Sequence, residues 1–439
     1  MLFNSVDFLV FFAFVITISV IIKNKNFSYV FLVAVSYIFF YFSNNFLISL
    51  LVFSTVLDFY IAKAIWSTDD KSKKKKLLLI SIIGNLGLLG FFKYADFGIS
   101  QFNDLFKLIG LNDVPLLEIA LPVGISFYTF QTLGYTIDVY RGQLSPAKSF
   151  KEFALFVAFF PQLVAGPILR ASNFLPQIRE KFSQLNAKNY LQQILIQRTN
   201  LKIGLTLMSF GFFKKMFFAD NIAPFVDEIF LNPIGLDSFA IILGTIGFGI
   251  QLYCDFSGYS DIAIGAALIL GFKVPQNFNF PFFATSPTEF WRRWHISLST
   301  WVRDYVFYPM LNFKSSKLRL FVSVFATLFL IGIWHGAGWN FVIFGIVHGL
   351  YVGIETAIRS IFPSLQNNSF LKSRFGKIIS ILSTQYLILI GFLIFRVHNL
   401  EHLSYSVQKL IFIDLEINGV SSFILEHKFP LFLMMLFVI

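Results

Sequence analysis

Charged residues are scarce in this sequence of 439 residues, where Asp, Glu, Lys and Arg together make up 13%. Soluble domains carry about 25% charged residues, because ionised side chains keep a protein surface in water. Hydrophobic residues contribute 56%, and the mean hydropathy is +0.70. The composition excludes a water-soluble domain and predicts an integral membrane protein.

Cysteine, glycine and proline are also rare. The single cysteine, Cys254, excludes an intramolecular disulfide framework, and its apolar neighbours favour a small buried side chain over a nucleophile. With 27 glycines and 14 prolines against 60 phenylalanines, low-complexity disorder is excluded as well. The first apolar run, about 6–22, follows no basic segment and has no small-residue cleavage site, so we expect a retained span rather than a cleaved signal peptide.

Apolar runs long enough to cross a bilayer recur along the chain. They predict an all-α polytopic membrane protein of about ten spans, without a repeat that would suggest duplicated halves. The last run, 429–439, is too short to cross alone and is either a half-span or the cut edge of a longer chain. We interpret residues 1–439 as one membrane domain, with N-terminal spans in 1–150, a catalytic core in 151–360 and C-terminal spans, not necessarily complete, in 361–439. The expected spans are 6–22, 27–42, 46–66, 77–92, 116–137, 203–218, 238–253, 320–334, 341–358 and 378–397.

The net charge of +11 is concentrated in segments between these runs. Lys23 and Lys25 follow the first run, two further runs separate them from the densest basic segment at 71–76, and Arg141 and Lys148 follow two runs later. Because cytoplasmic loops are enriched in Lys and Arg, this alternation places the N-terminus outside and the basic segments in the cytoplasm. A nucleic-acid patch at 71–76 is rejected in such an apolar chain, and no nucleic-acid partner is expected.

The apolar run at 153–169 is interrupted by Pro161 and Pro167. Proline removes a backbone donor and clashes with the preceding turn, so a straight helix is not expected here. Broken backbone at membrane depth is tolerated only where protein or a wet cavity surrounds it. We therefore predict a broken or re-entrant helix, followed at 170–202 by a charged, partly helical cytoplasmic stretch.

The run at 203–218 carries the pair Lys214-Lys215 within an otherwise apolar segment. Long basic side chains can extend to the membrane interface, or they can bind an anionic ligand. We favour extension of the two lysine side chains to the membrane interface.

Aromatic and arginine side chains gather between residues 281 and 312. Such residues mark the headgroup level of a membrane, and their spacing predicts an amphipathic helix near the interface. A membrane-anchoring belt is the alternative for the tryptophans, but such a belt does not need His295 at its centre. The residues concerned are Trp291, Trp294, Trp301, Tyr305 and Tyr308, with Arg292, Arg293, Arg303 and Asp304.

Two histidines stand out, because each lies in a dense patch of unusual residues. His295 ends the segment Glu289-Phe-Trp-Arg-Arg-Trp-His295, and His335 lies between two apolar runs. A titratable ring at membrane depth is costly unless it has partners or a function. Imidazole also titrates near neutral pH, so the two histidines point to proton transfer.

The remaining histidines are less informative. We interpret His398, His402 and His427 as loop or interface residues. His348 lies on the apolar run after His335 and is a candidate for the same cavity. A haem-ligand interpretation of His335 and His348 is rejected, because at about 100° per residue the two do not share a helix face.

Several polar and aromatic motifs interrupt the apolar chain. They are Phe159-Phe-Pro-Gln-Leu-Val-Ala-Gly-Pro-Ile168, Phe212-Phe-Lys-Lys215, Asp255-Phe-Ser-Gly-Tyr259, Asp261-Ile-Ala-Ile-Gly265, Asn277-Phe-Asn-Phe-Pro281, the segment ending at His295, and Trp334-His-Gly336. Together they resemble the membrane-bound O-acyltransferase (MBOAT) family, most closely its bacterial alginate O-acetyltransferase branch. The resemblance runs from Met1 to beyond Tyr351 and is weak after Arg359. One departure is Met310-Leu-Asn-Phe-Lys314, where the family usually has a glycine pair, and it affects the shape of one loop.

The resemblance implies an MBOAT-like helical bundle, with re-entrant and interfacial helices around a central funnel. It also implies that His295 and His335 form the catalytic pair, with His335 as the essential base. O-acyl transfer needs a base to take a hydroxyl proton, and a buried neutral imidazole can accept it. His295 would orient the acceptor, stabilise the oxyanion or share the proton. Gly336 and Gly338 would let backbone approach the reacting centre.

Further candidates for contact with substrate accompany the two histidines. For the arginines, lipid phosphate is favoured over an anionic donor. For the two aspartates, packing and hydrogen bonding around the site are favoured. No metal site and no bound cofactor are expected. The candidates are Trp334, Gly336, Asn340, Trp294, Arg292, Arg293, Arg303, Asp304, Asp255, Asp261 and His348.

The function implied by the resemblance is O-acetyl transfer from cytosolic acetyl-CoA to an exported polysaccharide or to an extracytoplasmic carrier protein. The enzyme would be a multi-pass protein of the bacterial cytoplasmic membrane, in contact with membrane lipid. Within the family, D-alanyl transfer to teichoic acid from a carrier-protein thioester is the nearest alternative. A proton-coupled transporter that uses Asp255, Asp261, Glu355 and Arg396 is an alternative of another class.

Overall fold

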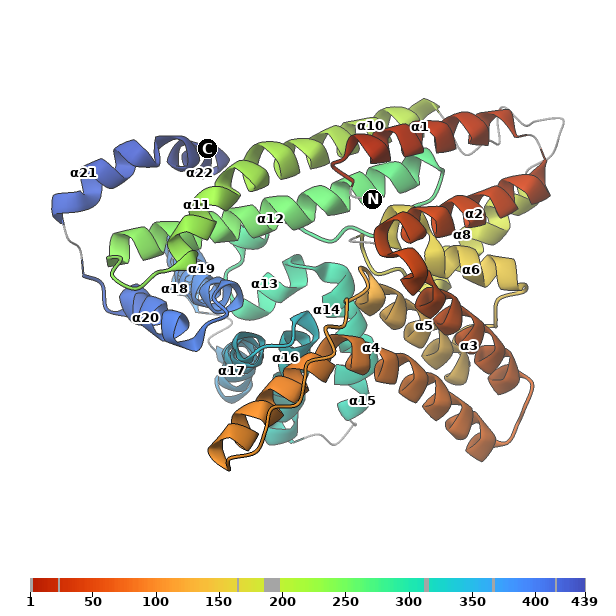
Figure 1. Ribbon diagram of the computed structural model, residues 1–439, viewed down its shortest axis with the longest axis horizontal. Coiled ribbons are helices and arrows are strands. Elements are labelled where there is room, and N and C mark those ends of the chain that lie inside the picture. Colours follow the sequence, from red (N-terminus) through yellow and green to blue (C-terminus); the bar gives the residue numbers. More distant parts are fainter. Residues whose placement is uncertain are drawn as a thin grey trace. The chain divides into compact units, whose positions relative to one another are not determined.

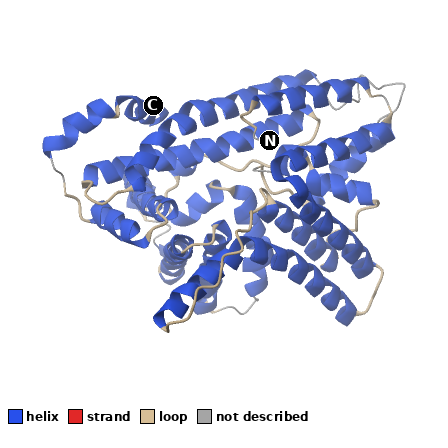
Figure 2. Ribbon diagram, viewed as in Figure 1, coloured by secondary structure: helices blue, strands red, loops and turns tan. Residues whose placement is uncertain are grey.

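The computed structural model of the protein describes residues 3–22, 24–163, 166–184, 198–311, 316–364, 368–414 and 417–438. All regular structure in these ranges is helical (Figure 2), so the predicted all-α class is confirmed. Two sequence predictions lie partly outside these ranges, namely the loop at 310–314 and the charged stretch at 170–202.

The described helices form two compact units, which we treat separately (Figure 1). The first unit consists of Met1–Phe210 and Tyr259–Pro275, and the second of Gly211–Gly258 and Gln276–Ile439. Both candidate catalytic histidines therefore belong to the second unit.

Several helices of the first unit, α1, α2, α4 and α6, start at a short polar side chain that accepts hydrogen bonds from the first backbone N–H groups. Asp70, for example, accepts hydrogen bonds from the backbone N–H of Ser72 and Lys73 at the start of α4. Among the described residues, the helices are α1 (Val6–Ile21), α2 (Lys25–Asn44), η1 (Asn45–Leu47), α3 (Ile48–Trp66), α4 (Lys71–Leu108), α5 (Ile125–Tyr140), α6 (Phe150–Ala158), α7 (Phe160–Leu163), α8 (Ala171–Gln184) and most of α10 (Arg198–Phe212).

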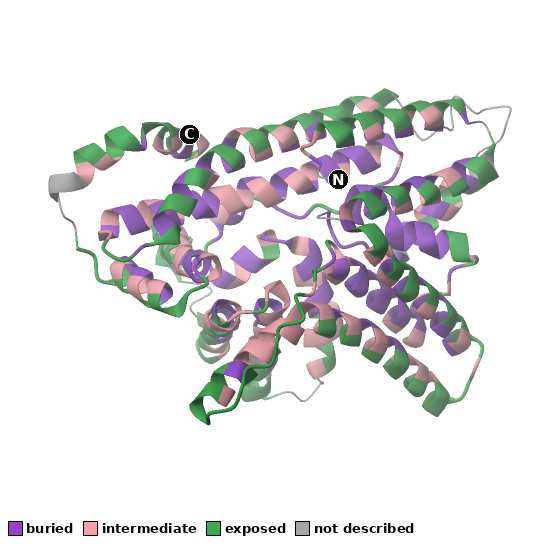
Figure 3. Ribbon diagram, in the orientation of Figure 1, coloured by how far each residue is buried: buried purple, intermediate pink, exposed green. Residues whose placement is uncertain are grey.

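The core of the first unit lies around α5 and α6, which are almost wholly buried (Figure 3). The predicted break at 153–169 is confirmed, because α6 ends at Ala158 and a separate short helix, α7, follows. The predicted run at 116–137 is helical only from Ile125. Gly124 adopts a φ of +85°, a left-handed conformation that ends the preceding loop and opens α5.

The second unit combines long helices with short and irregular ones. A π-helix, η3, continues α10 without a break into α11. Among the described residues, the elements are η3 (Phe213–Ala219), α11 (Asp220–Leu231), most of α12 (Ser238–Ile269), η4 (Pro281–Phe283), α13 (Pro287–Arg293), α14 (Ile296–Val302), η5 (Arg303–Phe307), α15 (Tyr308–Met310), α16 (Lys317–His335), α17 (Trp339–Ile361), α18 (Ser369–Lys372), α19 (Arg374–Arg396), α20 (Leu400–Ile411), α21 (Ile417–Glu426) and α22 (Lys428–Val438).

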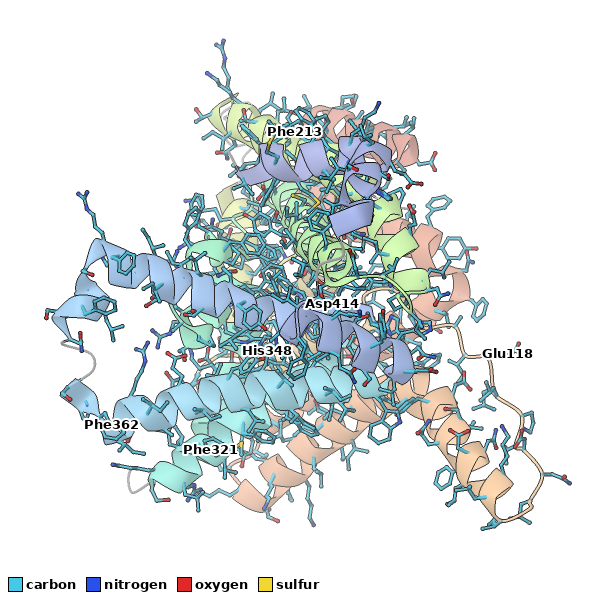
Figure 4. All side chains as sticks on the ribbon, turned by 90° about the vertical axis from the view of Figure 1, so that its left-hand side faces the viewer. Glu118, Phe213, Phe321, His348, Phe362 and Asp414 are labelled. Carbon is cyan, nitrogen blue, oxygen red and sulfur yellow. The ribbon has the colours of Figure 1, made fainter. Side chains whose placement is uncertain are left out.

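Helices α16 and α17 form a tight antiparallel hairpin. A methyl group added to Gly332 would come within 2.5 Å of Cα of Gly345, so the two backbones meet where neither residue has a side chain. Phe321 and Phe362 lie at the opposite end of the hairpin from His335 (Figure 4). The hairpin thus places His335 at one end of a close-packed helix pair.

Six described helices are long and apolar enough to cross a membrane. The expected number of about ten spans is not confirmed. The run at 6–22 forms a helix of only 16 residues, the runs at 27–42 and 46–66 fall within one helical stretch, and the run at 116–137 is helical only from Ile125. The six helices are Asn26–Trp66, Lys71–Leu108, Ser238–Ile269, Lys317–His335, Trp339–Ile361 and Arg374–Arg396.

Two predictions for the second half of the chain are wrong in detail. The span at 238–253 was expected to end before Asp255, but α12 continues to Ile269. The region 281–312 was expected to contain one amphipathic interfacial helix. Instead it is divided into short helices, and Trp291, Trp294 and Trp301 are buried. Hydropathy and spacing miss both features because they depend on tertiary contacts described below.

Candidate active site

His295 lies at the break between α13 and α14, in a left-handed backbone conformation with a φ of +44°. This conformation is uncommon for a residue with a side chain, and it costs conformational energy unless the surroundings hold it. The His295 side chain is only 2% exposed. The backbone therefore turns sharply at the residue that the sequence singles out, and the turn directs its ring inward.

Asn277 holds the backbone that follows His295. Its carbonyl accepts a hydrogen bond from the N–H of Ile296 over 2.9 Å. Its side-chain Oδ1 accepts two more, from the N–H of Ser297 over 3.1 Å and from the Ser297 hydroxyl over 2.8 Å. The sequence analysis quoted Asn277 within a motif but assigned it no role. Its place is to position His295.

The His295 ring packs among aromatic side chains of the second unit. Its centroid lies 4.6 Å from that of Phe256, edge to face, and 6.0 Å from that of Trp334. Trp334 in turn lies 4.9 Å from the ring of His335. Both histidine rings thus lie near the same indole ring. Burial, together with the neighbouring His335, lowers the pKa of His295 well below its usual range, so its ring is neutral at neutral pH.

His335 is the last residue of α16, and its side chain is partly exposed, whereas His295 is buried. Its ring lies 5.0 Å from Phe395 and 5.9 Å from Phe344. The difference in exposure between the two histidines matters chemically, because only an accessible imidazole can exchange a proton with a substrate hydroxyl.

The segment after His335 is held by contacts with its own hairpin and with α19. A side chain on Gly336 would overlap the ring of Phe341. Glycine is therefore needed here because there is no room for a side chain, and not because of its backbone conformation. Asn340 is buried and donates a hydrogen bond from Nδ2 to the carbonyl of Phe395 over 3.2 Å. The start of α17 is thereby joined to the end of α19.

His348 lies on α17, one helical turn beyond Phe344, and its ring lies between α17 and α19 (Figure 4). Its ring centroid is 4.3 Å from that of Phe344, which also contacts His335. Its Nε2 faces Gly391, where any side chain would collide with the imidazole. His348 therefore belongs to the aromatic wall of the site and not to its exposed part.

Trp294 is buried in a cluster of aromatic rings rather than placed in an interfacial belt. Its ring centroid lies 5.0 Å from Phe278, 5.4 Å from Phe290 and 5.4 Å from Phe392. The cluster joins α13 to α19 and supports the turn at His295 from behind.

The candidate arginines have local partners. Arg293 pairs with Glu289 on the same helix over 2.6 Å, and Arg303 pairs with Asp304 over 2.8 Å. Arg292 is exposed. These contacts account for Arg293, Arg303 and Asp304 as structural ion pairs at the surface of the second unit.

Asp255 forms an ion pair with Lys215, which also pairs with Asp220 over 2.7 Å. Lys215 was expected to extend to the interface, and the paired carboxylates are a third arrangement that the sequence analysis did not consider. Lys214 lies over the ring of Tyr253, with its Nζ 5.9 Å from the centroid. Asp261 belongs to the first unit.

Two pockets lie at opposite ends of α17 and α19. One has a volume of about 620 Å³ and is lined by Glu355, Arg359, Lys372 and Lys377, among others. The other, about 690 Å³, lies where α19 gives way to α20, at the end that also carries His335. Within the ranges that the structure describes, no three His, Cys, Asp or Glu side chains are grouped as a metal site requires.

Comparison with known proteins identifies the family. Residues 142–401, more than half of the chain, match the model of MBOAT, the membrane-bound O-acyltransferase family. The chain is 36% identical over 379 residues to the probable alginate O-acetylase AlgI of Azotobacter vinelandii, covering 84% of this chain and 70% of that protein. It is 35% identical over 425 residues to the peptidoglycan O-acetyltransferase of Helicobacter pylori, covering 91% of this chain and 76% of that protein.

More distant matches exist in the same family. The teichoic acid D-alanyltransferase of Bacillus subtilis is 29% identical over 292 residues, covering 64% of this chain and 70% of that protein. The aligned region covers 62% of the probable alginate O-acetylase AlgI of Pseudomonas aeruginosa, so some relatives extend well beyond the matched part. With its family match, its apolar helices and its paired histidines, this chain belongs to the membrane-bound O-acyltransferase family and is a multi-pass O-acyltransferase.

Proposed function

We propose that this protein transfers an acetyl group from cytosolic acetyl-CoA to a hydroxyl group on the outer side of the bacterial cytoplasmic membrane, with His335 as the general base. The observation that carries the proposal is the pair of histidines whose rings both lie near the indole of Trp334, one partly exposed and one buried. Similarity to proteins named alginate O-acetylase and peptidoglycan O-acetyltransferase supports acetyl as the group that is moved.

The proposed reaction needs one base and one acid. His335 takes the proton of the acceptor hydroxyl while its oxygen attacks the carbonyl carbon of the thioester. A C–O bond forms, the C–S bond breaks, and the sulfur leaves with the proton returned by His335. The products are an acetyl ester and the free thiol. His295 supports His335 rather than replacing it, because the ring of His295 is buried whereas that of His335 is partly exposed.

The charge distribution supports an orientation for the second unit. One end of α16, α17 and α19 carries Lys317, Arg319, Arg359, Lys372 and Lys377. Cytoplasmic segments are enriched in Lys and Arg, so this end is assigned to the cytoplasm and the His335 end to the outer side. The same rule supports a periplasm-facing or extracellular N-terminus.

The basic pocket supports a donor that carries phosphate groups. Arg359, Lys372 and Lys377 line it, and guanidinium and ammonium groups bind phosphate oxygens by charge-assisted hydrogen bonds. The face of α17 leads from Glu355 past His348 to Phe344, about 16 Å at 1.5 Å per residue. The extended arm of coenzyme A would follow this face toward His335.

D-alanyl transfer is the second candidate, because the chain also matches teichoic acid D-alanyltransferases. That reaction would use the same base and an acyl thioester of a different kind. The acceptor is equally open, since the names of the more similar relatives point to a polysaccharide in one case and to peptidoglycan in another.

The experiment that tests the proposal supplies the purified full-length protein, in lipid nanodiscs, with alginate or peptidoglycan fragments as acceptor and with radiolabelled acetyl-CoA or a D-alanyl carrier protein as donor. Acetylated product is expected only with acetyl-CoA and wild-type His335. His335→Gln should abolish transfer while the protein elutes as a single species and melts within a few degrees of wild type. Transfer at a normal rate by His335→Gln would refute the assignment of the base, and D-alanyl transfer would replace the donor.

A further inference from the structure

A pocket of the second unit opens at the end of α19, beside the residue that we assign as the base. Its volume is about 690 Å³, and its walls come from α11 and from the corner between α19 and α20. The polar residues that line it are Asp227, Glu228, Arg396, His398, Asn399 and His402. None of them takes part in the chemistry described above, and the sequence alone suggested only loop or interface residues for the two histidines.

The wall of this pocket connects to His335 through two aromatic rings. The His398 ring centroid lies 5.7 Å from that of Phe341, and Phe341 lies 5.1 Å from Phe395. Phe395 lies 5.0 Å from His335. The rings of Phe341 and Phe395 thus lie between His398 of this pocket and the base, at the end of the helices that we assign to the outer side.

Carboxylates outnumber permanent cations in this pocket. Arg396 donates to Asp227 over 2.7 Å, and Glu228 lies 3.3 Å from Nε2 of His427. The side chains of Asp227 and Glu228 nevertheless remain 65% and 62% exposed, so both carboxylates face the opening. Burial and the nearby guanidinium of Arg396 lower the pKa of His398, which leaves its ring neutral at neutral pH.

The size and composition of the pocket select the kind of ligand. Sites for small ligands have volumes of about 300 to 1,000 Å³, and this pocket falls in that range. A folded protein partner would instead need an interface of about 1,000 Å² or more. The carboxylate, amide, imidazole and guanidinium groups offer both donors and acceptors, which suits the hydroxyl groups of a sugar. A chain of uronic acids would bring further carboxylates against Asp227 and Glu228.

We propose that this pocket binds the acceptor as one or two units of a neutral or amino sugar, and that its two carboxylates exclude polyuronates. The inference rests on the proposed function, since a sugar chain held in this pocket would extend past the rings of Phe341 and Phe395 to supply the hydroxyl whose proton His335 takes as the C–O ester bond forms and the C–S bond breaks. Specificity of this kind arises from a repulsive element as much as from attractive contacts.

Direct binding tests the inference without relying on transfer. Isothermal titration of the purified full-length protein in nanodiscs compares N,N′-diacetylchitobiose with a dimannuronate at one ionic strength. The neutral disaccharide is expected to bind about ten-fold more tightly, because like charges in a shared pocket repel. Equal or tighter binding of the dimannuronate would overturn the proposal.

Variants assign the binding to the pocket. Asp227→Asn with Glu228→Gln should weaken binding of the neutral disaccharide about five-fold, through lost charged acceptors, and should bring dimannuronate closer to it. His402→Ala, which leaves the Asp227–Arg396 pair intact, should weaken the neutral disaccharide as well. Glu401→Gln is the matched control, because Glu401 is exposed on the same helix and does not line the pocket.

The outcomes separate this inference from the proposed function. His335→Gln should retain disaccharide binding although it loses transfer, since His335 does not line the pocket. If acetyl transfer is observed but disaccharide binding is absent or unchanged in all pocket variants, the acceptor site lies elsewhere and the inference fails, while the assignment of the reaction stands. If wild-type protein binds the disaccharide in this pocket but transfers no acetyl group, the inference stands and the proposed function fails.

Discussion

The indole Nε1 of Trp291 donates a hydrogen bond to Nδ1 of His348 over 3.3 Å. Because Nδ1 accepts this bond, the proton of the neutral imidazole resides on Nε2, which faces Gly391 of α19. One ring therefore joins α13, α17 and α19. The three helices are thereby held together next to Phe344, whose ring contacts both His348 and the candidate base.

Trp291→Phe should lower the stability of the protein while leaving the histidines in place. The lost hydrogen bond leaves a buried acceptor on His348, which is expected to cost about 1 to 3 kcal/mol. Thermal unfolding in detergent, followed by tryptophan fluorescence or by light scattering, measures the change. Trp66→Phe, at an exposed tryptophan of the first unit, is the control and should shift the melting temperature little. Equal shifts for both variants would show that the bond contributes nothing.

Asn277→Ala should slow acyl transfer by releasing the backbone beside His295. The variant loses two hydrogen bonds to Ser297, and displacement of a positioned group typically costs about 10- to 100-fold in rate. We expect the loss in kcat, with KM for the donor unchanged.

The conservative variant distinguishes positioning from general damage. Asn277→Asp keeps the acceptor oxygen at Oδ1 and should recover most of the rate. Asn279→Ala, two residues away on the exposed side, should behave as wild type. If Asn277→Asp is as slow as Asn277→Ala, the acceptor is not what matters.

His295 should make the stability of the protein depend on pH. Burial and His335 hold its pKa in the folded state well below the value of about 6.5 for an unfolded chain. The unfolded state therefore binds the extra proton first, and stability is lost as the pH falls below about 6.5, by at most about 1.4 kcal/mol per pH unit. His295→Asn removes this contribution, and asparagine tolerates the left-handed backbone at this position.

The measurement is the melting temperature between pH 8 and pH 5, for wild type and His295→Asn in parallel. The wild-type curve should fall more steeply toward acid than that of the variant. Two parallel curves would mean that His295 is protonated at the same pH in the folded and unfolded states, contrary to its burial.

Lys215→Met should destabilise the second unit, because it leaves the carboxylates of Asp220 and Asp255 without their shared cation. Both carboxylates are partly exposed, so the expected cost is moderate, about 1 to 2 kcal/mol. Lys214→Met makes the same substitution at the neighbouring residue and should lower the stability less. Adding Asp255→Asn to Lys215→Met should recover part of the lost stability. If it does not, the ion pair between Lys215 and Asp255 does not contribute to stability.

Long apolar helices could be predicted from the sequence with good bounds. The runs at 320–334, 341–358 and 378–397 became α16, α17 and α19, because hydropathy over a full span is a local property. The break near Pro161 was also predictable, since proline acts on its own helix. The paired histidines were singled out for the same reason, as polar rings within apolar sequence.

The features that the sequence analysis missed depend on partners distant in the chain. The helix α12 runs on through Asp255 because Lys215 neutralises the carboxylate. The turn at His295 is held by Asn277. Lys215 lies far from Asp255 in the sequence, and Asn277 far from His295. A local sequence pattern therefore cannot reveal that the members of each pair lie together. The expected count of about ten spans is not confirmed, because the bounds of several shorter helices do not follow the apolar runs.

The contact between Gly332 and Gly345 limits how the site can open. If either helix of the hairpin rotated or slid, a larger side chain would move into the space now left by Gly332 and Gly345 and would clash with the other helix. Helices α16 and α17 therefore behave as one rigid pair. The contacts of His335 with α19 are made by rings, which can turn about their bonds. During a catalytic cycle, room for a substrate at His335 must come from the α19 side, with the hairpin as the fixed frame against which it moves.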